Sequence, residues 1–88
     1  MTALLAILLA AGFEIDPTFD IAGIDDAELW HDDALALYVP VNARTVELGD
    51  CLGRSAGSLP ADRAVAFLQA ADLDNAAAVF TAWKVLAA

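Results

Sequence analysis

The first thirteen residues, Met1 to Phe13, contain no charged side chain, and five large aliphatic residues between positions 4 and 9 make this stretch strongly apolar. A helix that crosses a bilayer needs about 20 such residues, and Glu14 and Asp16 end this run well short of that length. A secretory signal starts with Lys or Arg, which the segment lacks. We therefore predict that residues 2–11 form a buried first helix, which Gly12 ends in a left-handed conformation.

The later part of the chain predicts a hairpin and two more helices. Residues 35–48 contain two β-favouring stretches joined by a short polar connection, which is typical of a β-hairpin. Pro40 has no N–H to donate, so its strand is expected at a sheet edge or with a bulge. Residues 49–58, rich in Gly and Ser, predict an irregular stretch. Helical spacing of apolar residues predicts helices over about 59–71, capped by Ser58, and from Asp72 or Asp74 to about Leu86.

Residues 25–33 fit a short helix with Asp25 as its N-cap and acidic residues in its first turn. Such a helix would turn Trp30 towards the core and point Leu29 outwards through an arc of carboxylates. Together, these elements predict one compact domain over residues 1–88. Its expected fold is α+β and mostly helical, with a small hairpin over about 35–48 packed on three to four helices.

The acidic residues are concentrated in one segment of the chain. Thirteen acidic residues against four basic ones give a formal net charge of −9, and eight of the acids lie between Glu14 and Asp33, where there is no Lys or Arg. This balance argues against direct binding to nucleic acid or to an anionic membrane, because both are bound through Lys and Arg. One interpretation is a solvated surface that keeps an apolar chain in solution. The other is a binding surface for a basic partner. The predicted partner-binding residues are Asp20, Asp25, Asp26, Glu28, Leu29, Asp32 and Asp33.

Few residues are suited to catalysis or to metal binding. Cys51 and His31 are each the only residue of their type, and we expect Cys51 to be a small buried hydrophobe rather than a nucleophile. Residues 16–20 begin like a calcium loop, but the Gly and the Glu that such a loop requires later are missing. Glu28 and His31 match one half of a di-iron motif whose second half is lacking. We therefore expect no catalytic residue, no metal and no cofactor, and a chain that is not an enzyme.

These observations favour a non-enzymatic acidic protein that occupies a basic, nucleic-acid-binding surface of a partner protein or ribonucleoprotein. In its size, its charge and its lack of catalytic groups, the chain is similar in kind to phage-encoded anti-defence inhibitors, including anti-CRISPR proteins and DNA mimics. The single Cys fits a reducing compartment, so a cytoplasmic location is expected.

Two alternatives remain open from the sequence. The last predicted helix is apolar on nearly every side, which is typical of a helix that pairs with another chain. A small phage or bacterial assembly or adaptor subunit would use it for self-association, as a homodimer for example, and the candidate contacts are Phe80, Trp83 and Leu86. An antitoxin-like partner protein would share the acidic surface with the inhibitor.

Overall fold

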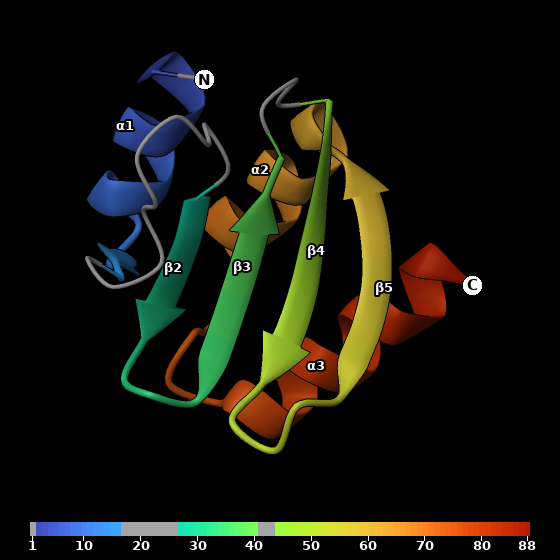
Figure 1. Ribbon diagram of the computed structural model, residues 1–88. Coiled ribbons are helices and arrows are strands. Elements are labelled where there is room, and N and C mark those ends of the chain that lie inside the picture. Colours follow the sequence, from blue (N-terminus) through green and yellow to red (C-terminus); the bar gives the residue numbers. More distant parts are fainter. Residues whose placement is uncertain (1, 17–26, 41–43) are drawn as a thin grey trace.

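The computed structural model describes residues 2–16, 27–40 and 44–88, and a five-stranded antiparallel sheet lies at its centre (Figure 1). The strands lie side by side in the order in which they occur in the chain, so each pairs with its sequence neighbours. Their bounds are Glu14–Ile15 for β1, Ala27–His31 for β2, Leu35–Val39 for β3, Thr45–Asp50 for β4 and Ser55–Pro60 for β5.

The described helices are α1 (Thr2–Ala10), α2 (Ala61–Ala70) and α3 (Ala76–Ala87), and Figure 1 shows α2 and α3 behind the sheet. Helix α1 lies near β2 and contributes Leu8 to the core that α2 and α3 share with the sheet. The prediction for its end is confirmed, because Gly12 has a φ of +107° and the Phe13 N–H donates to the Leu8 carbonyl at 3.2 Å. Among the described residues, none of the helices combines the length and apolar character that a bilayer crossing requires.

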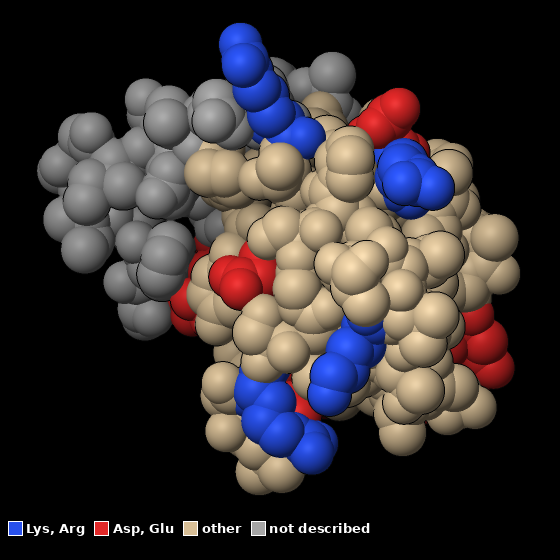
Figure 2. Space-filling model, turned by 90° about the vertical axis from the view of Figure 1, so that its right-hand side faces the viewer, with Lys and Arg blue, Asp and Glu red and all other residues tan. Residues whose placement is uncertain are grey.

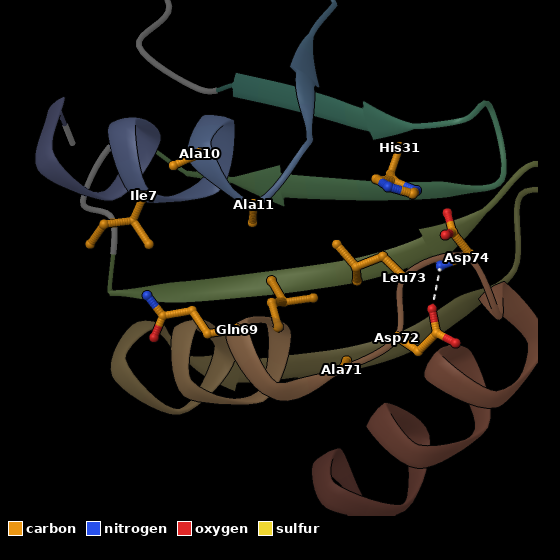
Figure 3. A pocket seen from close by; sticks show the side chains of 10 residues that line it. Ile7, Ala10, Ala11, His31, Gln69, Ala71, Asp72, Leu73 and Asp74 are labelled. Carbon is orange, nitrogen blue, oxygen red and sulfur yellow. Dashed lines mark hydrogen bonds between the residues drawn. The ribbon is translucent and has the colours of Figure 1, made fainter.

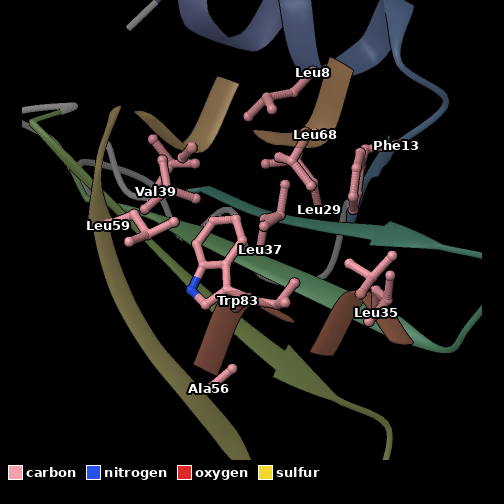
Figure 4. Packing of buried hydrophobic residues seen from close by; sticks show 14 residues of the cluster. Leu8, Phe13, Leu29, Leu35, Leu37, Val39, Ala56, Leu59, Leu68 and Trp83 are labelled. Carbon is pink, nitrogen blue, oxygen red and sulfur yellow. The ribbon is translucent and has the colours of Figure 1, made fainter. Parts of the chain in front are cut away.

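The core lies between the helices and one face of the sheet (Figure 4). Trp83 of α3 is fully buried there, with its ring edge-on to Phe67 at a centroid distance of 5.6 Å. Its Nε1 donates to the carbonyl oxygen of Gly57 in β5 at 2.8 Å. A Cβ on Gly57 would lie 2.9 Å from the Cβ of Ala87, so only glycine allows β5 and α3 to approach this closely. The buried strand residues that pack against this layer are Leu29, Leu35, Leu37, Val39, Val46, Leu48, Ala56 and Leu59.

The predicted fold, a mostly helical domain with one small hairpin, is wrong, because the hairpin is only the middle of a five-stranded sheet. The hairpin itself exists as β3 and β4, with Leu37 paired to Leu48. Val46 and Leu48, two residues apart, share its buried face. The edge position expected from Pro40 is also wrong, since β3 is the central strand. Pro40 avoids the ladder because β3 ends one residue before it.

The short helix predicted over residues 25–33 is wrong where the structure describes this segment, which forms β2 and a turn. Asp32 and Asp33 have φ values of +50° and +56°, and the Ala34 N–H donates to the His31 carbonyl at 3.0 Å. Short polar side chains tolerate this left-handed geometry better than most residues. Asp32 and Asp33, which were predicted to end an acidic helix, therefore form the turn between β2 and β3.

The irregular stretch predicted over residues 49–58 is largely ordered, because β4 continues to Asp50 and β5 begins at Ser55. Ser58 therefore lies in β5 and does not cap a helix, and α2 begins only after Pro60. The predicted caps of the last helix are also wrong. The side chain of Asn75 caps α3 by accepting from the Ala78 N–H at 3.4 Å.

Candidate functional site

The sheet face that is turned away from the helices carries a pattern of carboxylates and aromatic rings. Side chains alternate along a strand, so the neighbours of the buried Leu29 and Leu37 point to this other side. Cross-strand pairing aligns these neighbours in rows, because paired residues share a face. We define the outer face as the residues Glu14, Glu28, Trp30, Tyr38, Glu47 and Ser58.

The two aromatic rings of the outer face lie against its carboxylates. Trp30 Nε1 donates to Glu28 Oε1 at 2.7 Å, which holds the indole at a fixed position on the sheet. Tyr38 is paired with Glu28 on one side and with Glu47 on the other. Partial burial of Tyr38 raises its pKa above the usual value, and the negative charges of Glu28 and Glu47 raise it further. The phenol therefore stays neutral and keeps its hydrogen at neutral pH.

A hollow of about 450 Å³ opens at the β1–β2 end of the outer face. We call it the acidic hollow. Its carboxylates belong to Glu14 of β1, to Asp16 directly after β1, to Glu28 of β2 and to Asp33 of the β2–β3 turn. The β4–β5 turn contributes the thiol of Cys51. Its described lining contains four carboxylates and no Lys or Arg. The lining residues are Glu14, Ile15, Asp16, Glu28, Trp30, Asp33 and Cys51.

The geometry of the acidic hollow suits a cation. Like charges gathered around one concave space raise the local negative potential, and a Lys or Arg that entered would lower it. The indole of Trp30 adds an aromatic face, to which ammonium and guanidinium groups are attracted. Cys51 is exposed here, so its predicted burial is wrong.

The predicted partner-binding residues are divided between different sides of the structure. Glu28 and Asp33 line the acidic hollow. Asp32 is exposed, but its carboxylate lies 3.7 Å from Nδ1 of His31 and does not line the hollow. Leu29 has no exposed surface, so its predicted role as an outward anchor is wrong. Trp30, predicted to support the core, lies on the outer face. Asp20, Asp25 and Asp26 lie outside the described residues.

Sequence reasoning missed several residues of this surface. The acidic segment includes Glu14 and Asp16, but the predicted contact does not, and the sequence predicts Tyr38 and Glu47 only as parts of a hairpin. The sequence signal for this surface is the alternation of polar and apolar residues over positions 28–31. In a strand, this alternation places Glu28 and Trp30 on one face and Leu29 on the other.

The basic residues lie on other parts of the molecule. They are carried by the segment before β4, the β4–β5 turn, α2 and α3, at Arg44, Arg54, Arg63 and Lys84. Figure 2 shows Lys and Arg side chains spread over the side of the molecule where β5 and α3 lie. The bases of the described chain therefore do not line the acidic hollow, and the side that carries them also carries Asp and Glu (Figure 2).

The Arg54 side chain is held in the β4–β5 turn by an ion pair. Its Nε donates to the Asp50 carboxylate at 2.7 Å, and its guanidinium lies 5.5 Å from the ring centroid of Phe80. Desolvation raises the pKa of Asp50. Hydrogen bonds from the Arg54 backbone and side chain and from the Leu52 N–H outweigh this effect, so the pKa is lowered overall.

The predicted self-association residues of α3 differ in their exposure. Trp83 is fully buried, so its assignment as an intermolecular contact is wrong. Phe80 is half-buried, while Leu86 and the neighbouring Val85 are 50% and 71% exposed.

Comparisons with models of known protein families, with curated proteins and with solved structures gave no match for this chain. The functional argument therefore depends on the geometry and the charges described above.

Proposed function

We propose that this chain is a non-enzymatic binding protein whose outer face accepts a Lys- and Arg-rich surface of a partner protein or ribonucleoprotein. The observation that carries the proposal is the acidic hollow, whose described lining holds four carboxylates together with Trp30 and no Lys or Arg. The net charge of −9 acts at longer range by attracting a basic partner before contact is made.

The hollow and the neighbouring aromatic rings have separate roles in this proposal. An Arg or Lys of the partner enters the hollow, makes charge-assisted hydrogen bonds to its carboxylates and lies against the Trp30 indole. The hydrogen bond from Trp30 to Glu28 keeps the ring in place before binding, so little side-chain freedom is lost in the complex. Tyr38 extends the contact across the sheet as a neutral aromatic side chain.

The partner surface that best fits this chemistry is one that otherwise binds nucleic acid. Such surfaces carry clustered Lys and Arg that neutralise phosphates, and carboxylates on the outer face would compete for the same cations. The proposal therefore keeps the inhibitor function expected from the sequence, in the class of anti-defence proteins and nucleic-acid mimics, and places it in the cytoplasm. It moves the contact from an acidic helix to the outer face.

Two variants with the same change in charge test this proposal. Glu14→Lys with Asp33→Asn removes two negative charges from the acidic hollow and adds one positive charge, a net change of +3. Asn tolerates the positive φ of position 33. Asp62→Lys with Asp72→Asn makes the same change of charge at two exposed positions on the helix side. Each protein is used to capture partners from a bacterial lysate at about 150 mM salt, where long-range attraction is largely screened.

We expect the wild type and the helix-side variant to retain the same bound protein, and the hollow variant to lose it by at least about tenfold in affinity. Added nucleic acid should displace the bound protein if the surfaces compete. Equal retention by both variants would contradict the proposal. Capture of a toxin at the outer face would identify the antitoxin-like form of the same function.

A second candidate function is supported by the exposure of Val85 and Leu86 at the end of α3. Two exposed aliphatic residues on the last helix suit a homodimer or an assembly subunit. Light scattering tests this candidate on the wild type and on a Val85→Gln, Leu86→Gln variant. A dimer that becomes monomeric in the variant supports it, whereas a monomeric wild type rules it out.

A further inference from the structure

A second group of ligating side chains lies on the helix side of the sheet, away from the acidic hollow. One nitrogen of His31 and one carboxylate oxygen each of Asp32 and Asp74 all lie within 4.8 Å of one another. His31 and Asp32 belong to the end of β2 and the following turn, while Asp74 belongs to the connection between α2 and α3. Figure 3 shows the His31 ring directed towards Asp74, beside Leu73.

His31 supplies an independent sign that a ligand belongs here. Its Nδ1 is buried and has no hydrogen-bond partner among the residues that the structure describes, although its side chain as a whole is 13% exposed. A buried polar atom that is left unsatisfied destabilises the folded state, so most such atoms have a partner. The Asp32 carboxylate is the nearest charged group, but at 3.7 Å it is too distant for a hydrogen bond.

The surroundings hold the imidazole in this position. The Phe13 ring lies 5.6 Å from the His31 ring, centroid to centroid. Gly12 also lies beside the imidazole, since a Cβ built on it would be in van der Waals contact with the ring at 3.4 Å. The ring is therefore packed by the connection between α1 and β1, while the two carboxylates are exposed and free to adjust by rotation.

We propose that His31, Asp32 and Asp74 bind a divalent transition-metal ion of the Zn²⁺ class. Two ligand atoms on a tetrahedral zinc are about 3.4 Å apart, since each bond is about 2.0–2.2 Å long. The separation of 3.7 Å between His31 Nδ1 and the Asp32 carboxylate is close to this value. The three ligand atoms lie within 4.8 Å of one another, and rotation of the exposed carboxylates would shorten the longer separations. The imidazole ligand favours Zn²⁺ over Mg²⁺ or Ca²⁺, which prefer oxygen.

The proposed ion would join two parts of the fold that are far apart in sequence. It would connect the β2–β3 turn to the α2–α3 connection, across the edge of the pocket lined by Ile7, Ala11 and Leu73. Three protein ligands leave a fourth position for water. Because only the folded chain brings His31 and Asp74 together, binding would stabilise the folded state.

The experiment titrates the full chain with Zn²⁺ alone at neutral pH and follows the imidazole signals of His31 by NMR. His31 is the only histidine, so these signals need no assignment. Calorimetry gives the affinity and stoichiometry. The background is Cys51→Ser, which removes the exposed thiol as a competing ligand.

The variants His31→Gln and Asp74→Asn each remove one ligand, and Asp72→Asn is the matched control. Asp72 lies in the same connection, and its Oδ1 accepts from the Asp74 N–H at 3.2 Å, which an Asn can still do. We expect one Zn²⁺ per chain, a shift of the His31 signals and a higher midpoint of thermal unfolding. Circular dichroism checks that each variant folds.

Loss of a ligand should weaken binding by at least about tenfold, because changes outside the ligand set alone cost that much in metal sites. The Asp72→Asn control should bind as the wild type does. Binding that is equal in His31→Gln, or His31 signals that do not move at millimolar Zn²⁺, would overturn the proposal.

Discussion

At the scale of single residues, two glycines show how differently the same backbone geometry is used. Gly57 and Gly53 have φ values of +94° and +80°, a region that residues with a side chain rarely adopt. Around Gly53 there is open space within 4 Å, whereas Gly57 is in close contact with Ala87 of α3. Only Gly57 therefore combines a conformational requirement with a steric one.

We expect Gly57→Ala to lower the free energy of unfolding by about 2–4 kcal/mol, because backbone strain adds to a clash with Ala87. Gly53→Ala carries only the strain and should cost about 1–2 kcal/mol. Urea unfolding measures both. Equal losses in the two variants would contradict the close approach of β5 and α3.

Tyr38 offers a second test at this scale, because it is the only tyrosine and its ionisation is visible in the ultraviolet spectrum. Its pKa is raised by burial and by the charges of Glu28 and Glu47. Glu47→Gln removes one of these charges and should lower the Tyr38 pKa towards that of an exposed tyrosine. Glu14→Gln, which changes a carboxylate that does not contribute to the shift, should leave it unchanged.

The same shift makes stability depend on pH in the alkaline range. The folded-state pKa of Tyr38 lies above the unfolded value of about 10. Its contribution to stability is therefore complete below the unfolded pKa and is lost as the pH rises through the folded one. The wild type should lose more stability across this range than Glu47→Gln, and the reverse order would contradict the pairing of Tyr38 with Glu47.

At the scale of elements, β2 decides which residues reach the outer face. A helix would have exposed Leu29, but the strand buries it completely. Leu29→Ala should therefore lower the free energy of unfolding by about 2–5 kcal/mol through lost contacts and a cavity. Leu52, which is 74% exposed, is the matched control, and Leu52→Ala should change it by about 0.5 kcal/mol or less. A Leu29→Ala variant with the free energy of unfolding of the wild type would contradict the assignment of β2 to the sheet.

Some elements could be predicted from local sequence, while others depend on their neighbours. The end of α1 at Gly12 and the hairpin of β3 and β4 follow from a positive-φ glycine and from runs of β-favouring residues. β5 could not be predicted in this way, since Ser55–Pro60 has almost no such residues. It is a strand because Val46 pairs with Leu59 and because small residues let α3 approach.

For β2 the local sequence is ambiguous. Ala27, Trp30 and Ala34 recur with helical spacing, while Glu28, Leu29 and Trp30 alternate as in a strand. Pairing with β3, whose buried residues need a neighbour on each side, decides between the two. The choice between helical and strand periodicity decides which face each carboxylate of β2 occupies. The sequence therefore predicts some of the residues of the acidic hollow but not their arrangement.

At the scale of the whole molecule, the separation of charge is the property on which the proposed function depends. Carboxylates of β1, β2 and the β2–β3 turn line one hollow together with Trp30, while none of the described basic residues lines it. Such a separation orients an approaching basic surface as well as attracting it. The second tryptophan, Trp83, is buried on the opposite side of the sheet and bonded to Gly57, so it does not take part in this surface.

The two indole N–H groups therefore allow one direct measurement of the central claim. An Arg-rich peptide of about ten residues is titrated into the ¹⁵N-labelled chain at about 150 mM salt, and both indole signals are followed by NMR. The account predicts that the Trp30 signal shifts and saturates, because its donor is bonded to Glu28 in the acidic hollow, while the Trp83 signal stays in place. A Trp30 signal that does not move, or shifts confined to α3, would contradict it.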